Sequence, residues 1–437
     1  MDVAHLVHAA VMSTSRPAPV RLTDLAEPTF PAHMINVRAT MAGMAASAPL
    51  DAEALLAAAR AGTGFTDFGD LAFVPRLRLL LHALTTEGRL SDVGRVMAHT
   101  QLLQFLKNRL KVEALFARHP EAAEIAIRAP IVIAGLPRTG TTHLHNLLAA
   151  DPALRSLPYW ESLEPVLLDE ELPAAGEPDP RRARCDQALW FVNESLPYFV
   201  RMHEMTTDHV HEEIQLLALD LSTMLFETMG VMPSWREAYR TEDQTGSYRY
   251  LRRVLQAIGF QNGGGDGRWV LKSPQHLEQI GPLLAAFPDA VVVFTHRDPP
   301  SVIASYVTMA AYTARMSQQA PIDLRALGRY WRERIEEVLR ACVRDRHLVA
   351  AERSIDVRFD EFMRDDLAMV RRIYALAGQP VTSEAEAAWA AFMAAHPRGA
   401  HGTVEYDLAQ FGLEAREIRE ACGFYVERFG VAHEGAR

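Results

Sequence analysis

The segment from residue 131 to residue 150 constrains the fold of this chain more than any other part of its sequence. The apolar run Ile131-Val132-Ile133-Ala134 predicts a buried strand. It leads directly into the glycine-containing loop Gly135-Leu136-Pro137-Arg138-Thr139-Gly140-Thr141-Thr142. Leucines then recur at helical spacing, at Leu144, Leu147 and Leu148. A strand that passes through a glycine loop into a helix is typical of nucleotide-binding α/β proteins.

Further strands and helices alternate after this unit. Trp269-Val270-Leu271-Lys272 predicts a second strand, and the apolar run from Ala290 to Thr295 predicts a third, with a crossover helix from about Gln275 to Phe287 between them. A fourth strand is expected from Ser354 to Phe359. Strands that alternate with helices predict a parallel sheet covered on both faces. Together with the glycine loop after the first strand, they predict a three-layer α/β fold of the P-loop NTPase-like class.

The first part of the chain has a different character. Residues 1–125 are rich in Ala, Leu and Arg at helical spacing and predict a helical region, so residues 126–437 are expected to form the catalytic domain. The longest apolar stretch, from Ile214 to Met232, contains Asp220 and Glu227. These two acids favour one buried helix over a membrane span.

Composition excludes some partners and locations. The 437 residues include 45 basic and 55 acidic side chains, a formal net charge of −10, which argues against binding to nucleic acid or to an anionic membrane. The three cysteines are far apart and match no metal-site spacing, so we expect no disulfide and no metal. The first twenty residues do not resemble a signal peptide, and a cytoplasmic protein is expected.

The loop has the frame of a phosphate-binding loop but lacks its usual lysine, which Thr141 replaces. Backbone N–H groups at the N-terminus of a helix favour a bound phosphate or sulfate. Arg138 can supply the missing cation, with a planar fork that suits an oxyanion. The missing lysine makes a magnesium-dependent NTP hydrolase a weaker interpretation.

This loop resembles the 5′-phosphosulfate loop of the sulfotransferases that use 3′-phosphoadenosine-5′-phosphosulfate (PAPS), and most of all the bacterial group similar to tyrosylprotein and carbohydrate sulfotransferases. The family pattern G-x-P-R-[ST]-G-T-[ST] matches the whole loop. The resemblance implies that the loop binds the 5′-phosphosulfate of PAPS, and the candidate residues are Gly135, Pro137, Arg138, Thr139, Gly140, Thr141 and Thr142.

Three further segments fit the same family. An Arg at a strand end followed eight positions later by a Ser is the family's 3′-phosphate pair, and Arg297 and Ser305 have this spacing. Lys272 matches a strand-end lysine on the leaving-group side of the donor, where its charge would stabilise the departing phosphate oxygen. The segment that contains Arg398 and Gly402 is similar to the one that closes over the nucleotide.

The general base is expected to be either Glu161 or Glu213. Glu161 follows the first helix of the fold, and Glu213 opens the apolar stretch described above, where burial would raise its pKa into a useful range. Imidazole also titrates near neutral pH. Four histidines therefore remain candidates, namely His203, His209, His211 and His276.

The sequence thus predicts a sulfotransferase that moves the sulfuryl group of PAPS to a hydroxyl, rather than an amine, of a small and apolar acceptor, and releases PAP (3′,5′-ADP). The main alternative is a P-loop kinase or NTPase that uses ATP. Arg297 and Ser305 distinguish the two, because ATP has no 3′-phosphate for them to bind. A third alternative is a nucleotide-binding module without catalytic activity.

Overall fold

A five-stranded parallel sheet lies at the centre of the computed structural model, which describes residues 17–174, 176–264 and 267–435. The strand order is β2-β5-β1-β6-β7. The bounds of the strands are β1 Ile131–Gly135, β2 Leu154–Arg155, β5 Arg268–Ser273, β6 Val291–His296 and β7 Ser354–Arg358. The predicted parallel α/β fold is confirmed, and the four predicted strands form four adjacent strands of the sheet.

The register of the sheet aligns the ends of its three middle strands. Ala134 of β1 is opposite Ser273 of β5, and Gly135 is opposite Thr295 of β6. The loop after β1, the strand end at Lys272 and the turn after β6 therefore share one edge of the sheet. This carboxyl edge is where open parallel sheets bind their ligands.

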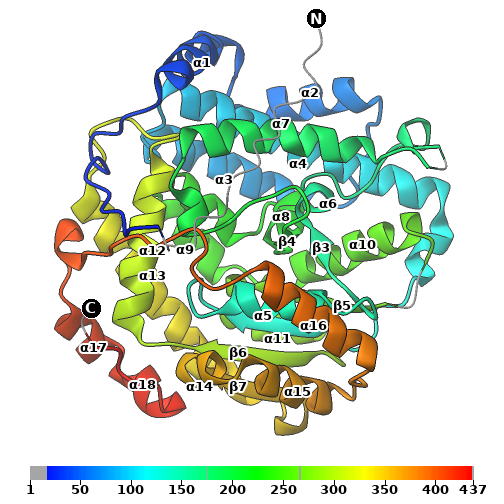
Figure 1. The fold of residues 1–437 in the computed structure, drawn as a ribbon. Coiled ribbons are helices and arrows are strands. Elements are labelled where there is room, and N and C mark those ends of the chain that lie inside the picture. Colours follow the sequence, from blue (N-terminus) through cyan, green and yellow to red (C-terminus); the bar gives the residue numbers. More distant parts are fainter. Residues whose placement is uncertain (1–16, 175, 265–266, 436–437) are drawn as a thin grey trace, which may run out of the picture.

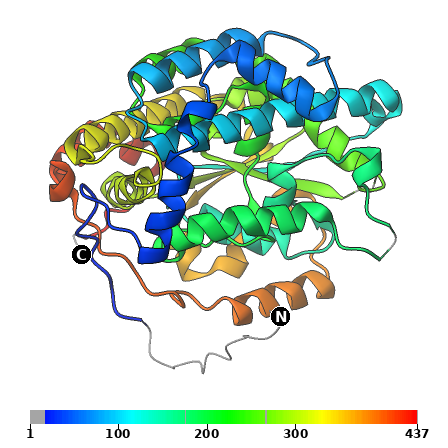
Figure 2. The same ribbon diagram turned by 90° about the horizontal axis from the view of Figure 1, so that it is seen from above.

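Helices cover both faces of the sheet, which lies between the blue and cyan helices of the first third of the chain and the orange helices that follow β7 (Figures 1 and 2). Alternate residues of β1 enter two separate cores, because side chains alternate between the faces of a strand. Val132 and Ala134 pack with the helices α3, α4 and α10–α13, and Ile131 and Ile133 pack with α5 and α14–α16. The helices have the following bounds: α1 Ala32–Ala42, α2 Ala52–Thr63, α3 Phe73–Thr86, α4 Asp92–Arg118, α5 Thr141–Ala149, α6 Tyr159–Leu163, α7 Pro180–Ser195, α8 Ile214–Leu217, α9 Pro233–Thr241, α10 Thr245–Gln261, α11 Ile280–Ala286, α12 Pro299–Ala314, α13 Leu324–Asp345, α14 Phe359–Arg364, α15 Asp366–Ala377, α16 Ser383–Ala395, α17 Ala415–Ala421 and α18 Gly423–Phe429.

The helices α2–α4 form a layer over one face of the sheet, and their leucines share a core with the sheet strands. Asp51 caps α2 and Ser91 caps α4 with side-chain oxygens that accept backbone N–H groups of the first turn. Arg109 of α4 is buried and joins this layer to the rest of the fold through an ion pair of 2.8 Å with Asp220. Residues 1–16 of the predicted helical region lie outside the described part of the chain.

The prediction of one long helix from Ile214 to Met232 is wrong. The structure divides this stretch into α8 and two 3-10 helices, η5 Ala218–Asp220 and η6 Met224–Met229. Leu221 lies between them with a left-handed φ of 52°, and there the chain changes direction. The two acids explain the break, because each reaches a buried arginine in a different helix: Asp220 pairs with Arg109 of α4 and Glu227 with Arg334 of α13.

A small antiparallel pair, β3 Leu157–Pro158 and β4 Val210–His211, lies outside the main sheet. It matters for the site because it brings the segment from Thr206 to Glu213 back beside the start of α6. Among the described residues, no helix has the length and apolar character needed to cross a membrane.

Candidate active site

Tight packing fixes the loop that follows β1. A Cβ atom on Gly135 would lie 1.8 Å from Thr295 Oγ1, so only glycine fits beside β6 at this position. Gly140, the residue before α5, has a left-handed φ of 86°, which glycine adopts without strain. Thr139 Oγ1 bonds both the Leu136 carbonyl and Thr295 Oγ1, each at 2.7 Å. These contacts hold the first turn of α5, which contains Thr141 and Thr142, at the carboxyl edge of the sheet.

Arg138 links the loop to three other segments. Its Nε donates to Ser305 Oγ of α12 at 2.8 Å, its Nη1 donates to the Met202 carbonyl, and its Nη2 lies 3.4 Å from the Tyr406 hydroxyl. Its own carbonyl accepts a hydrogen bond of 2.6 Å from Arg297 Nη1. The structure therefore brings together the loop and both members of the pair Arg297 and Ser305, which are far away in the sequence.

The segment around Arg398 reaches the same region through contacts with the first turn of α5. Arg398 pairs with Asp366 at 2.8 Å, and Asp366 also bonds His143 in the first turn of α5 at 2.9 Å. Gly402 has a left-handed φ of 79° and packs against Arg201 and Pro17. Together with the contact of Tyr406 to Arg138, these positions place residues 398–406 next to the loop.

Lys272 is buried at the end of β5, and its ammonium group donates to Glu212. The backbone N–H of Lys272 donates to Glu213 Oε2 at 2.8 Å, and Glu213 Oε1 accepts a hydrogen bond from His276. His276 Nδ1 then accepts from the Tyr248 hydroxyl at 2.8 Å, because Nε2 carries the proton that the carboxylate binds. Both carboxylate oxygens of Glu213 are thus engaged inside the protein.

Glu161 lies apart from this group. It is buried in α6, and its Oε1 accepts a hydrogen bond of 2.7 Å from Asn262, which precedes β5. Burial raises the pKa of Glu161, and Arg181 and Arg155 oppose that rise. Asn262 lies in the turn between α10 and β5, and in the described part of the chain the Glu161 side chain makes no hydrogen bond to the loop or to Lys272. The structure does not bring Glu161 to the loop.

Four histidines surround Lys272. The rings of His203 and His209 lie 5.1 Å apart between centroids, and those of His209 and His211 lie 5.9 Å apart. His145 of α5 completes this group, which we call the histidine cluster. Burial lowers the pKa of all four imidazoles, and the positive charge of Lys272 lowers it further, to about 4 for His209. The histidine cluster is therefore neutral at pH 7.

Within the cluster, His203 and His209 are half-buried and His145 and His211 are fully buried. Arg138 donates to the carbonyl of Met202, the residue before His203, and the charge of Arg138 also lowers the pKa of His203. Sequence reasoning had included three of these histidines among its candidates but had missed His145. The position of His145 in the helix that directly follows the loop was the one feature of the sequence that pointed to the site.

The histidine cluster predicts a pH dependence of stability. In the unfolded chain these histidines bind protons near pH 6.5, whereas in the folded chain their lowered pKa values keep them neutral. The unfolded state therefore gains protons first, and stability falls as the pH drops below 6.5, by about 1.4 kcal/mol per pH unit for each histidine. Urea unfolding at pH 7 and pH 5.5 measures this slope.

The matched variants for that measurement are His145→Gln and His82→Gln. His145 is buried in the cluster and His82 is exposed on α3. We expect His145→Gln to make the slope shallower and His82→Gln to leave it unchanged. Equal slopes in the wild type and His145→Gln would contradict the account of the cluster.

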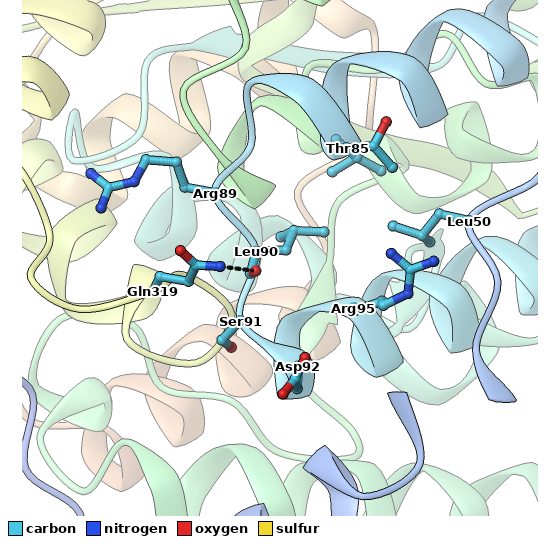
Figure 3. A pocket seen from close by; sticks show the side chains of 9 residues that line it. Leu50, Thr85, Arg89, Leu90, Ser91, Asp92, Arg95 and Gln319 are labelled. Atoms are coloured by element: carbon cyan, nitrogen blue, oxygen red, sulfur yellow. Dashed lines mark hydrogen bonds between the residues drawn. The ribbon is translucent and has the colours of Figure 1, made fainter. Parts of the chain in front are cut away.

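A separate pocket of about 190 Å³ lies on the helical layer (Figure 3). It is lined by the start of α4 and by Gln319, whose Nε2 donates to the Leu90 carbonyl at 3.0 Å. Gln319 follows α12, and this 16-residue helix spans about 24 Å from its start beside Arg297. The pocket is therefore distinct from the loop. The described residues include no group of three or more His, Cys, Asp or Glu side chains placed to bind a metal ion.

The parallel sheet and the loop at its carboxyl edge define an α/β protein of the P-loop-like class. The family model for the sulfotransferase family matches residues 130–383, and the chain belongs to this family. This match runs from the residue before β1 to the start of α16.

Relatives and solved structures agree with this assignment. The chain is 26% identical over 269 residues to the omega-hydroxy-beta-dihydromenaquinone-9 sulfotransferase Stf3 of Mycobacterium bovis, a match that covers 56% of this chain and 61% of the relative. It is similar to the crystal structure of sulfotransferase STF9 from Mycobacterium avium, with a TM-score of 0.78 and 26% identity over 89% of this chain and 99% of the other. For sulfotransferase STF1 from Mycobacterium tuberculosis H37Rv the TM-score is 0.73, with 29% identity over 84% and 97%.

Proposed function

We propose that this sulfotransferase takes the sulfuryl group from PAPS, transfers it to a hydroxyl of a small, apolar acceptor and releases 3′,5′-ADP. The observation that carries this proposal is the contact set of Arg138. Arg138 donates to Ser305, and its carbonyl accepts a hydrogen bond from Arg297. The side chains of Arg297 and Ser305, which can bind one phosphate, therefore lie beside a loop that can bind another phosphate. A donor with phosphates at the 3′ and 5′ positions of its ribose fits this arrangement, and ATP, which has no 3′-phosphate, does not.

The donor site in this proposal consists of the loop residues 135–142, Arg297, Ser305 and the segment with Arg398 and Gly402. The first turn of α5 turns its N–H groups toward the 5′-phosphosulfate. Lys272 neutralises the charge that develops on the 5′-phosphate oxygen when the bond from sulfur to that oxygen breaks. The new bond forms between sulfur and the acceptor oxygen, and the proton of the acceptor hydroxyl passes to a base.

We assign the role of the base to His209. Its half-buried ring lies 5.1 Å from that of His203 between centroids, and its lowered pKa of about 4 keeps it free to accept a proton at neutral pH. Glu213 is a positioning residue in this assignment, because its two oxygens hold the Lys272 backbone and His276. Glu161 is given no part in the chemistry, because its buried carboxylate binds Asn262 and, among the described residues, makes no hydrogen bond to the loop or to Lys272.

Two observations support an apolar alcohol as the acceptor. Phe199 lies 5.8 Å from His203 between ring centroids, and Tyr159 lies 4.6 Å from His211, so aromatic side chains border the histidine cluster. The name of the mycobacterial relative, in addition, describes a sulfotransferase of a hydroxylated menaquinone. A neutral cluster with aromatic neighbours favours a hydroxyl on an apolar body over a charged acceptor.

The test is a screen with PAPS and pairs of acceptors that share one carbon skeleton and carry either a hydroxyl or an amine. We expect an alcohol to give a sulfated product and one 3′,5′-ADP for each PAPS consumed, and its amine partner to give much less. Transfer of the γ-phosphate of ATP to the same acceptors, with PAPS unused, would contradict the proposal and favour the kinase.

A further inference from the structure

In the proposed function, the guanidinium group of Arg297 binds the 3′-phosphate of the donor. In the structure, a carboxylate of this chain already pairs with that group. Glu434, in the segment that follows α18, pairs with Arg297 through two hydrogen bonds: Nε to Oε1 at 2.6 Å and Nη2 to Oε2 at 2.8 Å. Arg297 also lies 4.0 Å from the centroid of the Phe359 ring. The edge of the guanidinium group that binds two oxygens of one anion is therefore already in use.

Backbone contacts hold Glu434 in this position. Its N–H donates to Asp298 Oδ2 at 3.0 Å, and its carbonyl accepts a hydrogen bond of 2.9 Å from Arg419 of α17. Arg419 also bonds Asp298 Oδ2 at 3.1 Å. Asp298 is buried at the start of α12 and directly follows Arg297. The turn after β6 thus binds both the backbone and the side chain of Glu434.

We propose that Glu434 is an internal competitor of the donor's 3′-phosphate, an inference that rests on the proposed function. The two oxygens of its carboxylate stand where two oxygens of a phosphate would bind the same guanidinium edge. Both anions cannot use that edge at once, and their like charges repel each other. The 3′-phosphate therefore binds when the Glu434 side chain leaves Arg297.

The exposure of the pair explains why Glu434 lowers the affinity of the site for the nucleotide and does not prevent the nucleotide from binding. The side chains of Arg297 and Glu434 are 21% and 35% exposed, and ion pairs with this access to water contribute little to stability. A 3′-phosphate carries more charge than a carboxylate and has Ser305 nearby as a further donor. Glu434 consequently weakens both PAPS and 3′,5′-ADP, and it favours release of the product.

The experiment is isothermal titration of 3′,5′-ADP and 5′-ADP into the wild-type protein, Glu434→Gln and the control Glu427→Gln. The glutamine keeps the size of the side chain and leaves the backbone contacts of residue 434 intact. Glu427 is an exposed acid on α18, so its variant has the same change in net charge. We expect Glu434→Gln to bind 3′,5′-ADP about tenfold more tightly, and Glu427→Gln to bind it as the wild type does.

The two nucleotides separate this inference from the proposal on which it rests. We expect all three proteins to bind 5′-ADP alike, because it has no 3′-phosphate to compete with Glu434. Equal or weaker binding of 3′,5′-ADP to Glu434→Gln, compared with the wild type, would overturn the inference and leave the donor site in place. If none of the three proteins bound 3′,5′-ADP, the proposed donor itself would be wrong.

Discussion

The variant His209→Gln is expected to retain the fold and to transfer the sulfuryl group about a thousandfold more slowly than the wild type. Glutamine fills a similar volume and can donate a hydrogen bond, but it cannot take the proton of the acceptor hydroxyl. Loss of a well-placed general base has an effect of this order. The measurement is kcat with saturating PAPS and the best alcohol from the screen.

Two further results would support His209 as the base. His203→Gln, which changes the neighbouring half-buried ring, should lower kcat much less. The acid limb of kcat/KM for the wild type should lie near pH 4, because the free enzyme holds the pKa of His209 at about 4. An undiminished rate in His209→Gln would show that His209 takes no part in the chemistry. An equal loss in both variants would contradict the assignment of His209 as the base.

Lys272→Met is expected to lower kcat by about a hundredfold to a thousandfold, with little change in the affinity for 3′,5′-ADP. The ammonium group acts on charge that appears only as the sulfuryl group leaves, so its loss affects the rate more than the binding of the nucleotide. Rapid-quench measurement of a single turnover gives the rate of the chemical step separately from product release.

Lys272 is buried against Glu212, so removing its charge leaves a half-buried carboxylate without its cation. The double variant Lys272→Met with Glu212→Gln corrects for this. We expect the double variant to recover thermal stability and to remain slow. Recovery of activity along with stability would show that Lys272 has a structural role alone.

Most of the fold could be predicted from the sequence, because local patterns determine it. The run before Gly135 and the runs that end at Lys272 and Thr295 are short, apolar and separated by helical segments, and all three became neighbouring parallel strands. The stretch from Ile214 to Met232 did not follow its local pattern. Its acids pair with arginines of α4 and α13. The hydropathy of one segment gives no information on partners that are so far away in the sequence.

The residues of the proposed donor site followed the sequence more closely than those proposed to face the acceptor. The loop motif and the spacing of Arg297 and Ser305 indicated groups that the structure places in contact with Arg138. The carboxylates could not be assigned in this way. Glu213 precedes an apolar segment as expected, but the direction of its side chain depends on β5 and on His276, which lies 63 positions away.

The contact between Glu434 and Arg297 is a similar case, since 137 positions separate the two residues. The sequence marks Arg297 as an anion ligand and gives no sign that a carboxylate of the same chain already binds it. Only the packing of α17 and α18 against the turn after β6 brings the two together. Long-range ion pairs of this kind are read from the structure and not from the sequence.

The central claim is that this sulfotransferase recognises a donor with a 3′-phosphate, and calorimetric titration of the wild-type protein tests it most directly. We expect 3′,5′-ADP to bind without a metal and at least about tenfold more tightly than 5′-ADP, and Arg297→Ala to abolish most of that difference. Tighter binding of ATP with magnesium than of 3′,5′-ADP, or equal binding of 3′,5′-ADP and 5′-ADP, would contradict the account.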